Sequence, residues 1–386
     1  MIKRDEGSSE FDASNPHIFI DEIIDRIITN SCPDFPFMYD SEETGEKLLL
    51  FSAQRKFHGY RKHPSYIQYS MRYTNGHGRL LMKSSLEQEF ALHLPKGNKP
   101  WFEGWYVRVQ TKEISFAIIF GLQISNAKKS AFIQFLDTHT KKSRYVEYPW
   151  RAVTIQQHPF VLNIRGNRLS MNSVTLRLPQ LQADLLHSSL TPLQTSRYAP
   201  TIMGPFSYVP MECVHSIISL RHTVSGTIRL NDRCFQIHGS GYMEKDRGTS
   251  FPSSYAWFQS NNSEDTASCF FFSLAHIPFL AGSFQGCICV LMVHGKQLCF
   301  ATYLGCRVTE DRKNKQIVLK QYPLELHIRL DGEQGHTLAS PKQGAMQGRI
   351  QETLRGEAFV TLLCKGRHIK SWHFTQGGLE RAGIDI

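Results

Sequence analysis

From Trp101 to the C-terminal end, the chain alternates apolar and polar residues in short runs, with turn residues about every 8–12 positions. Successive side chains of a strand point to opposite faces, so a period of two predicts half-buried β-strands. Four residue pairs predict tight turns between paired strands: Gly166-Asn167, Asn231-Asp232, His294-Gly295 and Lys365-Gly366. About twenty such runs are too many for one twisted sheet. The pattern therefore predicts an all-β protein built from two antiparallel β-barrels or sandwiches.

Residues 1–95 do not follow this pattern, and we assign them to a partly ordered N-terminal extension. Asn15-Pro16 is a helix start, and the isoleucines after it recur at helical spacing, which predicts one short helix over 16–30. The irregular segment 191–205 divides the remainder into a first barrel, 96–200, and a second barrel, 201–386. The last strands, around 368–380, can cross over and pair with an early strand of the first barrel.

The net charge of +10 is distributed unevenly along the chain. Residues 1–50 carry four Lys and Arg against twelve Asp and Glu, whereas residues 51–386 carry 40 against 22. A basic body attracts nucleic acid, acidic ligands or an anionic membrane surface. The basic residues are not interleaved with a platform of aromatic side chains, so we expect no nucleic-acid binding. Peripheral contact with an anionic membrane stays open, and no run is long and apolar enough to span a membrane.

Cysteine usage and the missing motifs narrow the class of protein further. Nine cysteines, with no C-x-x-C pair, fit buried reduced thiols in a reducing compartment. The N-terminal stretch lacks the apolar core of a signal peptide and is too acidic for a transit peptide, which predicts a cytoplasmic protein. No phosphate-binding glycine loop, H-E-x-x-H motif or Cys/His metal spacing is present, so we expect neither a metal nor an organic cofactor. No G-x-S-x-G turn is present either, although a dispersed Ser-His-Asp triad stays open.

Three segments concentrate acidic, aromatic and amide side chains, and each can be explained by a functional or by a purely structural role. In Trp101–Tyr106, Glu103 and Trp105 point to one face of a strand, as a ligand-facing pair or as the tryptophan plug of a core strand. In Gly204–His215, Glu212 and His215 lie three residues apart in an apolar setting, which shifts the pKa values of such groups. A structural hydrogen bond explains this second pair equally well.

The third segment gives the most specific signal. Alternation places Tyr242, Glu244 and Asp246 on one strand face, and ionisable groups are costly to bury without a function or a dense network. The alternative is a purely structural role, in which the segment is a loop held by salt bridges to Lys245 and Arg247. In the strand that comes next, one face carries Trp257, Gln259 and Asn261.

The motifs F-E-G-W-Y, G-P-F-x-x-V-P-M-E-C-x-H-S, G-x-G-Y-x-E-K-D-x-G-x-S-F-P-S and W-x-Q-S-N follow one another in the chain. Together with Phe300–Tyr303, Ser340–Met346 and Gly378–Glu380, they resemble the tocopherol cyclase family from about residue 100 to 383. The resemblance implies two packed lipocalin-like β-barrels and a relation to carotenoid hydratases, in which a Tyr-x-Asp segment similar to Tyr242-Met243-Glu244 supplies the proton donor. Plant members of the family close the chromanol ring of vitamin E from a phytyl quinol.

The sequence departs from that family at three positions. Arg247 replaces a usual Trp, Asn262 a common His, and Val214 an aromatic residue. Lost aromatic side chains weaken the stabilisation of a carbocation, and an added arginine repels it. These departures favour either a different substrate or a protein that binds an isoprenoid, quinone or lipid without catalysis.

Our first hypothesis is an enzyme that protonates an isoprenoid alkene and lets a phenol or water oxygen add to it. Glu244 is the expected acid, supported by Asp246 or His215, with Glu212 and Glu103 as further candidates. The aromatic rings of Trp105, Tyr242 and Trp257 would shield the cation, and Gln259 and Asn261 would orient the nucleophile. Desolvation should raise the pKa of Glu244, unless Arg247 folds back onto it.

Overall fold

The computed structural model describes residues 86–384, except 141–142, 197–198, 280–281, 312 and 334, together with four two-residue strands nearer the N-terminus. Those strands form two pairs, β1 (Tyr39–Asp40) with β2 (Lys47–Leu48) and β3 (Leu50–Phe51) with β4 (Tyr69–Ser70). The chain divides into two compact units, Met1–Leu81 and Met82–Ile386, and the second unit holds both large sheets. The helix predicted over 16–30 lies outside the described residues.

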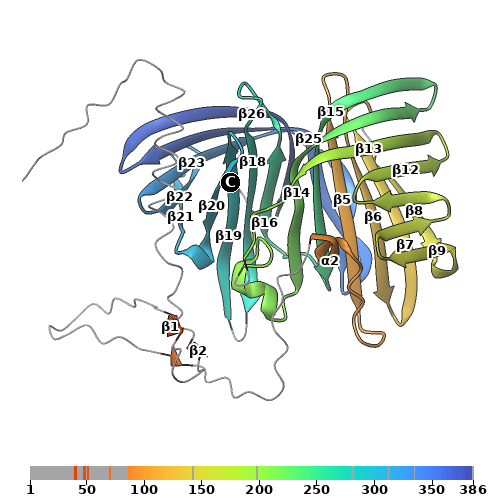
Figure 1. Cartoon of the computed structure of the whole chain (residues 1–386), viewed down its shortest axis with the longest axis horizontal. Helices are drawn as coiled ribbons and strands as arrows, with labels where there is room; N and C mark the ends of the chain where they lie inside the picture. Colours follow the sequence, from red (N-terminus) through yellow and green to blue (C-terminus); the bar gives the residue numbers. More distant parts are fainter. Residues whose placement is uncertain are drawn as a thin grey trace, which may run out of the picture. The chain divides into compact units, whose positions relative to one another are not determined.

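The first sheet of the second unit has eleven strands in the order β8-β7-β6-β5-β15-β14-β13-β12-β11-β10-β9 (Figure 1). Neighbouring strands are antiparallel. The bounds are β5 (Trp101–Gln110), β6 (Ser115–Ser125), β7 (Lys128–Asp137), β8 (Arg144–Pro149), β9 (Val153–Gln157), β10 (Phe160–Ile164), β11 (Asn167–Ser170), β12 (Ser173–Leu178), β13 (Leu181–Thr191), β14 (Cys213–Leu230) and β15 (Arg233–Gly248).

This sheet curls into a nearly closed barrel around one apolar core. Side chains from strands at both ends of the order, such as Tyr148 of β8 and Phe160 of β10, pack in the same cluster as Trp105 of β5. The edge strands β8 and β9 are consecutive in the chain and are joined by the short η1 (Trp150–Ala152). The one-turn helix α2 (Leu86–Phe90) adds Phe90, whose carbonyl accepts a 2.8 Å hydrogen bond from Trp105 Nε1.

The second sheet has the strand order β20-β19-β18-β16-β26-β25-β23-β22-β21, with β17 paired to β26 and β24 paired to β25. Two short 3₁₀ helices, η2 (Gly204–Tyr208) and η3 (Thr302–Leu304), lie in its connections. The strand bounds are β16 (Tyr255–Ser260), β17 (Asn262–Ser263), β18 (Cys269–Phe279), β19 (Gly282–Val293), β20 (Lys296–Ala301), β21 (Arg307–Asp311), β22 (Gln316–Gln321), β23 (Leu324–Asp331), β24 (His336–Lys342), β25 (Ala345–Cys364) and β26 (Arg367–Ala382).

The predicted all-β class with two antiparallel sheets is confirmed, but the division near residue 200 does not match the sheets. Strands β14 and β15, which lie within the range predicted for the second barrel, complete the first sheet because β15 pairs with β5. The change of sheet falls between Gly248 and Tyr255. Strand β26 pairs with β16 and β25, so 368–380 does not return to an early strand. Local alternation identifies strands and not their partners, which explains both differences.

The predicted turns agree with the structure more closely than the predicted division into barrels does. Asn231-Asp232, His294-Gly295 and Lys365-Gly366 each join two paired strands. The first predicted turn lies one residue earlier, at Arg165-Gly166, because Asn167 already begins β11. Among the described residues, no helix has the length and apolar character needed to cross a membrane.

A second apolar cluster lies between the two sheets and decides which strand faces form the site. Tyr106 of β5 and Tyr242 of β15 belong to it with Tyr255 and Trp257 of β16. Their chain neighbours on the opposite face, such as Met243, belong to the barrel core. Strands β5 and β15 therefore each have one face inside the barrel and one face toward the second sheet.

Two buried histidines in the barrel, His187 of β13 and His222 of β14, lead to a stability prediction. Their ring centres are 4.8 Å apart, and neither Nε2 atom has a hydrogen-bond partner among the described residues. Burial lowers the pKa of His187 to about 4 and that of His222 to about 3. An unfolded chain takes up these protons from about pH 6.5 downward and the folded chain does not, so this pair removes stability as the pH falls.

We therefore expect His222→Gln to lose less stability than the parent when the pH is lowered from 7 to about 4. The free energy of unfolding from urea titrations should diverge in favour of the variant by up to about 1.4 kcal/mol per pH unit. The same substitution at the exposed His158 is the control and should leave the pH dependence unchanged. Parallel pH profiles for His222→Gln and the parent would contradict the assignment.

Candidate functional site

A cleft lies between the two sheets, with an empty volume of about 1420 Å³ including the solvent at its mouth. It is lined from the first sheet by β5, β6, β7, β14 and β15, and from the second by β16, β18, β19, β24, β25 and β26. Most of its lining is apolar, and its aromatic side chains include Phe102, Tyr106, Phe206, Phe251, Tyr255 and Trp257. The ionisable groups on its wall include Glu212, His215, Glu244, Asp246 and Glu380. Such a cleft suits a hydrophobic ligand with few polar groups.

Glu244 is the central acid of this cleft. Its side chain comes from β15 and is 5% exposed. Tyr242 donates a 2.5 Å hydrogen bond to Oε2, and Trp257 Nε1 donates to the same oxygen at 3.2 Å. Burial raises the pKa of Glu244 to about 7, with Asp246 adding to the rise and His215 opposing it. Near neutral pH this carboxyl therefore exists in both its protonated and its ionised form.

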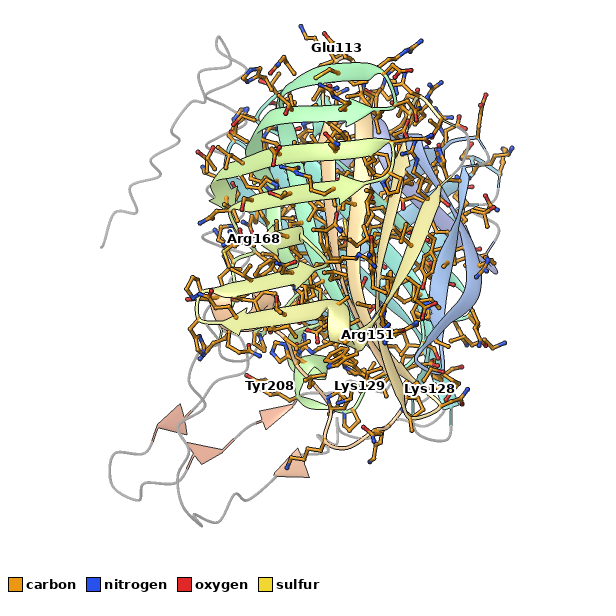
Figure 2. The ribbon with its side chains drawn as sticks, turned by 90° about the vertical axis from the view of Figure 1, so that its right-hand side faces the viewer. Glu113, Lys128, Lys129, Arg151, Arg168 and Tyr208 are labelled. Carbon is orange, nitrogen blue, oxygen red and sulfur yellow. The ribbon has the colours of Figure 1, made fainter. Side chains whose placement is uncertain are left out.

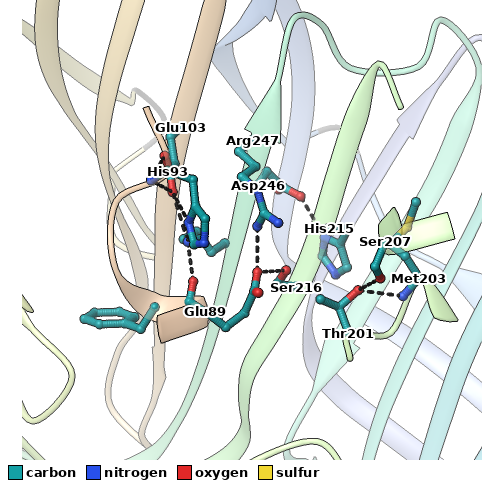
Figure 3. Close-up of polar contacts among 12 residues, drawn as sticks. Glu89, His93, Glu103, Thr201, Met203, Ser207, His215, Ser216, Asp246 and Arg247 are labelled. Atoms are coloured by element: carbon teal, nitrogen blue, oxygen red, sulfur yellow. Dashed lines mark hydrogen bonds and ion pairs between the residues drawn. The ribbon is translucent and has the colours of Figure 1, made fainter. Parts of the chain in front are cut away.

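His215 lies between Glu244 and Asp246. It is the register partner of Asp246 across β14 and β15, and its Nδ1 is 2.8 Å from Asp246 Oδ1 (Figure 3). Its Nε2 is 3.5 Å from Glu244 Oε2. Burial alone would lower the pKa of His215, but Asp246 and Glu244 raise it to about 9. At neutral pH His215 is thus a buried imidazolium that can hold or supply a proton between two carboxyl groups.

Two further carboxyls, Glu352 of β25 and Glu380 of β26, lie in the same region and were not among the predicted site residues. Tyr106 donates a 2.5 Å hydrogen bond to Glu352 Oε1, and Tyr255 donates a 2.7 Å bond to Glu380 Oε2. Glu380 lines the cleft. The motifs Gly378-Leu379-Glu380 and F-E-G-W-Y include Glu380 and Tyr106, whereas no motif in the sequence marks Glu352.

The structure brings together Glu212, His215, Glu244, Asp246 and Trp257 on the cleft wall, with Tyr242 bonded to Glu244 behind it. Glu103 and Trp105 lie elsewhere, which corrects their expected part in ligand binding. Both lie on the barrel-facing side of β5: Trp105 stacks on Phe160, and Glu103 binds Lys245 Nζ at 2.9 Å. The residues of that motif that reach the cleft are Gly104 and Tyr106 on the opposite face.

Gln259 and Asn261 also differ from the prediction that they orient a nucleophile. Gln259 accepts bonds from Arg108 Nη1 through its backbone and side-chain oxygens, and its Nε2 donates to Asn261 Oδ1 at 3.0 Å. Asn261 Nδ2 in turn donates to the Gly241 carbonyl at 2.8 Å. Neither lines the cleft. Gln259 holds the buried Arg108 of the first sheet, and Asn261 bonds to Gly241 of the same sheet.

Arg247 does not fold back onto Glu244. It points to the other face of β15, where its Nη1 lies 2.6 Å from Glu89 Oε1, which also accepts a bond from Ser216 (Figure 3). Arg247 is absent from the cleft wall, so its positive charge does not face a cation formed there. The structure thus removes one of the three reasons for doubting catalysis.

Donor atoms of His215, Glu244 and Asp246 lie within 4.8 Å of one another, a spacing at which such a set could hold a metal ion. Metal binding requires a neutral imidazole, and the raised pKa of His215 opposes the loss of its proton. The arrangement therefore suits proton exchange better than metal binding, and the expected lack of a metal or organic cofactor stays a prediction.

No family model matches the chain, and no curated protein matches it. Among solved structures, it is similar to a putative AttH from Nitrosomonas europaea, at 12% identity and TM-score 0.44 over 76% of this chain and 98% of that chain. Kievitone hydratase from Nectria haematococca has 8% identity and TM-score 0.42, over 78% and 93%. CghA bound to Sch210972 has 10% identity and TM-score 0.47, over 73% and 89%. These likenesses assign no activity to the chain.

Proposed function

We propose that this protein protonates an alkene of a hydrophobic, isoprenoid-type substrate and lets an oxygen nucleophile add to the resulting cation. The observation that carries the proposal is the Glu244 carboxyl, buried beside an apolar cleft with a pKa raised by burial to about 7. A carboxylic acid that keeps its proton near neutral pH is the donor such chemistry needs. The resemblance to tocopherol cyclases supports a prenylated quinol as substrate, with ring closure or hydration as the outcome.

The contacts of Glu244 indicate which of its two oxygens delivers the proton and which neighbouring group can replace that proton. Tyr242, Trp257 and His215 all contact Oε2. The other oxygen, Oε1, is the one we assign to proton delivery toward the substrate. After delivery, His215 can return a proton to the ionised carboxylate through Nε2, with Asp246 holding the imidazolium at Nδ1.

Aromatic faces around the acid support the cationic intermediate. The ring centres of Tyr106 and Trp257 are 5.6 Å apart, and those of Tyr242 and Trp257 are 6.3 Å apart. Tyr106 and Trp257 line the cleft. A cation over such faces is stabilised by about 0.5–2 kcal/mol per ring, and more where water is excluded.

The test is turnover in deuterated water with a panel of phytyl, geranylgeranyl and geranyl hydroquinones. We expect a cyclised or hydrated product that carries one solvent deuterium on the carbon that Glu244 protonates. Recovery of every quinol unchanged and undeuterated, with tight binding by tryptophan fluorescence, would replace this proposal with the alternative of a non-catalytic binding protein for an isoprenoid, quinone or lipid.

We also propose a cytoplasmic location with peripheral contact at an anionic membrane, from which such a substrate would be drawn. The described cysteines are free thiols, as a reducing compartment requires. Tyr208 of η2 is 51% exposed and lies at the same end of the unit as the exposed Lys128, Lys129 and Arg151 (Figure 2). Phe206 of the same short helix lines the cleft, so this end adjoins the proposed site.

Reversing the charges of Lys128 and Lys129 to glutamate should weaken binding to vesicles containing phosphatidylserine by about tenfold or more, since each basic residue near such a surface contributes about 1 kcal/mol. Vesicle sedimentation at physiological salt measures the effect. The matched control reverses Lys112, beside Glu113 at the opposite end, and Arg168, which are both exposed. Equal binding by the two double variants would refute this membrane face.

A further inference from the structure

Glu352 and Glu380 face each other directly across β25 and β26, as register partners. Directly opposed side chains in an antiparallel pair have Cβ atoms about 4.5–5.5 Å apart, so two carboxyls at these positions interact closely. Glu352 is fully buried, and its Oε2 has no hydrogen-bond partner among the described residues. Two ionised carboxylates repel each other strongly at such a position, and a proton held by one of them relieves the repulsion.

The surrounding groups hold this pair with one member exposed to the cleft. Tyr106 fixes Glu352 and Tyr255 fixes Glu380 through their hydroxyl groups. Glu380 lines the cleft and Glu352 does not. Burial raises the pKa of each carboxyl to about 8, and at Glu352 the facing Glu380 adds to the rise. Glu380 can therefore accept a proton in the ionised fraction of the molecules, which grows as the pH rises toward 8.

Glu380 is also close to the proposed acid. It is the register partner of Trp257, whose indole nitrogen donates to Glu244. Glu244 and Glu380 therefore both neighbour Trp257, and they come from different sheets and line the same cleft. Addition of an O–H group across an alkene needs both a proton donor and a proton acceptor within reach of one substrate.

We propose that Glu380 is the base that takes the proton from the attacking oxygen, and that the buried Glu352 opposite it holds the proton of the pair and so positions Glu380 as the ionised member. This inference rests on the proposed function and assigns its second catalytic residue. Glu244 transfers a proton to one alkene carbon, the phenol or water oxygen bonds to the other, and the O–H proton passes to Glu380. One proton is given and one is taken, so the addition is balanced, and exchange with water restores both carboxyls.

The decisive variant is Glu380→Gln, compared with the parent in deuterated water on the same hydroquinone panel. Without the base, the cation still forms but loses a proton again, so we expect recovered substrate that carries deuterium and about 10²-fold less product. Glu352→Gln should lower kcat and leave KM within about twofold, with a shifted pH profile. Glu325→Gln, on β23 away from the cleft, is the control and should match the parent.

A second measurement does not depend on turnover. Carboxyl carbon NMR of the parent should show that the pair holds at least one proton at pH 7, and in Glu380→Gln the pKa of Glu352 should fall because the facing carboxyl is gone. If the parent forms product and Glu380→Gln forms it equally fast, the base assignment fails and the proposed function stands. If the parent neither forms product nor deuterates any quinol, the proposed function fails, and this assignment fails with it.

Discussion

Replacing Glu244 with glutamine is expected to reduce turnover of a prenylated hydroquinone by about 10³-fold, since general acid catalysis contributes about 10²–10⁴-fold. Glutamine keeps the size of the side chain and an oxygen that can accept from Tyr242 and Trp257. It has no carboxylic proton to give to an alkene carbon. We therefore expect ligand binding, measured by tryptophan fluorescence, to change by less than about threefold.

The pH profile separates loss of the acid from a general disturbance of the cleft. Because the pKa of Glu244 is about 7, the fraction that carries the catalytic proton falls as the pH rises through that value. Once the pH exceeds about 8, where Glu380 is ionised as well, the parent should lose kcat/KM tenfold per pH unit, and the residual activity of Glu244→Gln should lack this limb. Glu325→Gln, away from the cleft, serves as the control and should keep the pH profile of the parent. Full activity in Glu244→Gln at any pH would overturn the acid assignment.

Replacing Lys245 with methionine is expected to lower the free energy of unfolding by about 3–5 kcal/mol, because it strands the fully buried Glu103. Lys245 Nζ also donates to the carbonyls of Glu89 and Ala91, and these bonds tie α2 and the residue after it to the barrel. Burial alone would raise the pKa of Glu103, and the ammonium of Lys245 lowers it below its usual value. Urea unfolding of the purified protein measures the loss.

Two comparisons test whether the ion pair is the cause. Glu103→Gln added to Lys245→Met removes the stranded charge and should recover much of the lost stability. Arg177→Ala breaks an exposed pair with Asp184 and should cost less than about 1 kcal/mol. A loss below about 1 kcal/mol for Lys245→Met, similar to that of the exposed pair, would contradict the prediction.

The acid side of the site could be predicted from local sequence because it lies on a single strand. Tyr242, Glu244 and Asp246 alternate along β15, and a period of two fixes their common face wherever the strand lies. The same rule separated Trp105 from Tyr106 on β5 but could not tell which face meets the cleft. Trp105 looked like a ligand-binding residue, and it is Tyr106 that lines the cleft.

The sequence by itself therefore determined the all-β class, the hairpin turns and the grouping of Tyr242, Glu244 and Asp246, because each depends on residues within one strand or one turn. Only the tertiary structure decided that β14 and β15 join the first sheet, that Glu103 binds Lys245 inside the barrel, and that Glu352 and Glu380 meet Tyr106 and Tyr255. Tyr106 and Glu352 are 246 positions apart in the chain. Contacts of that kind are set by which sheet faces pack together, and neither alternation nor spacing along the chain encodes that choice.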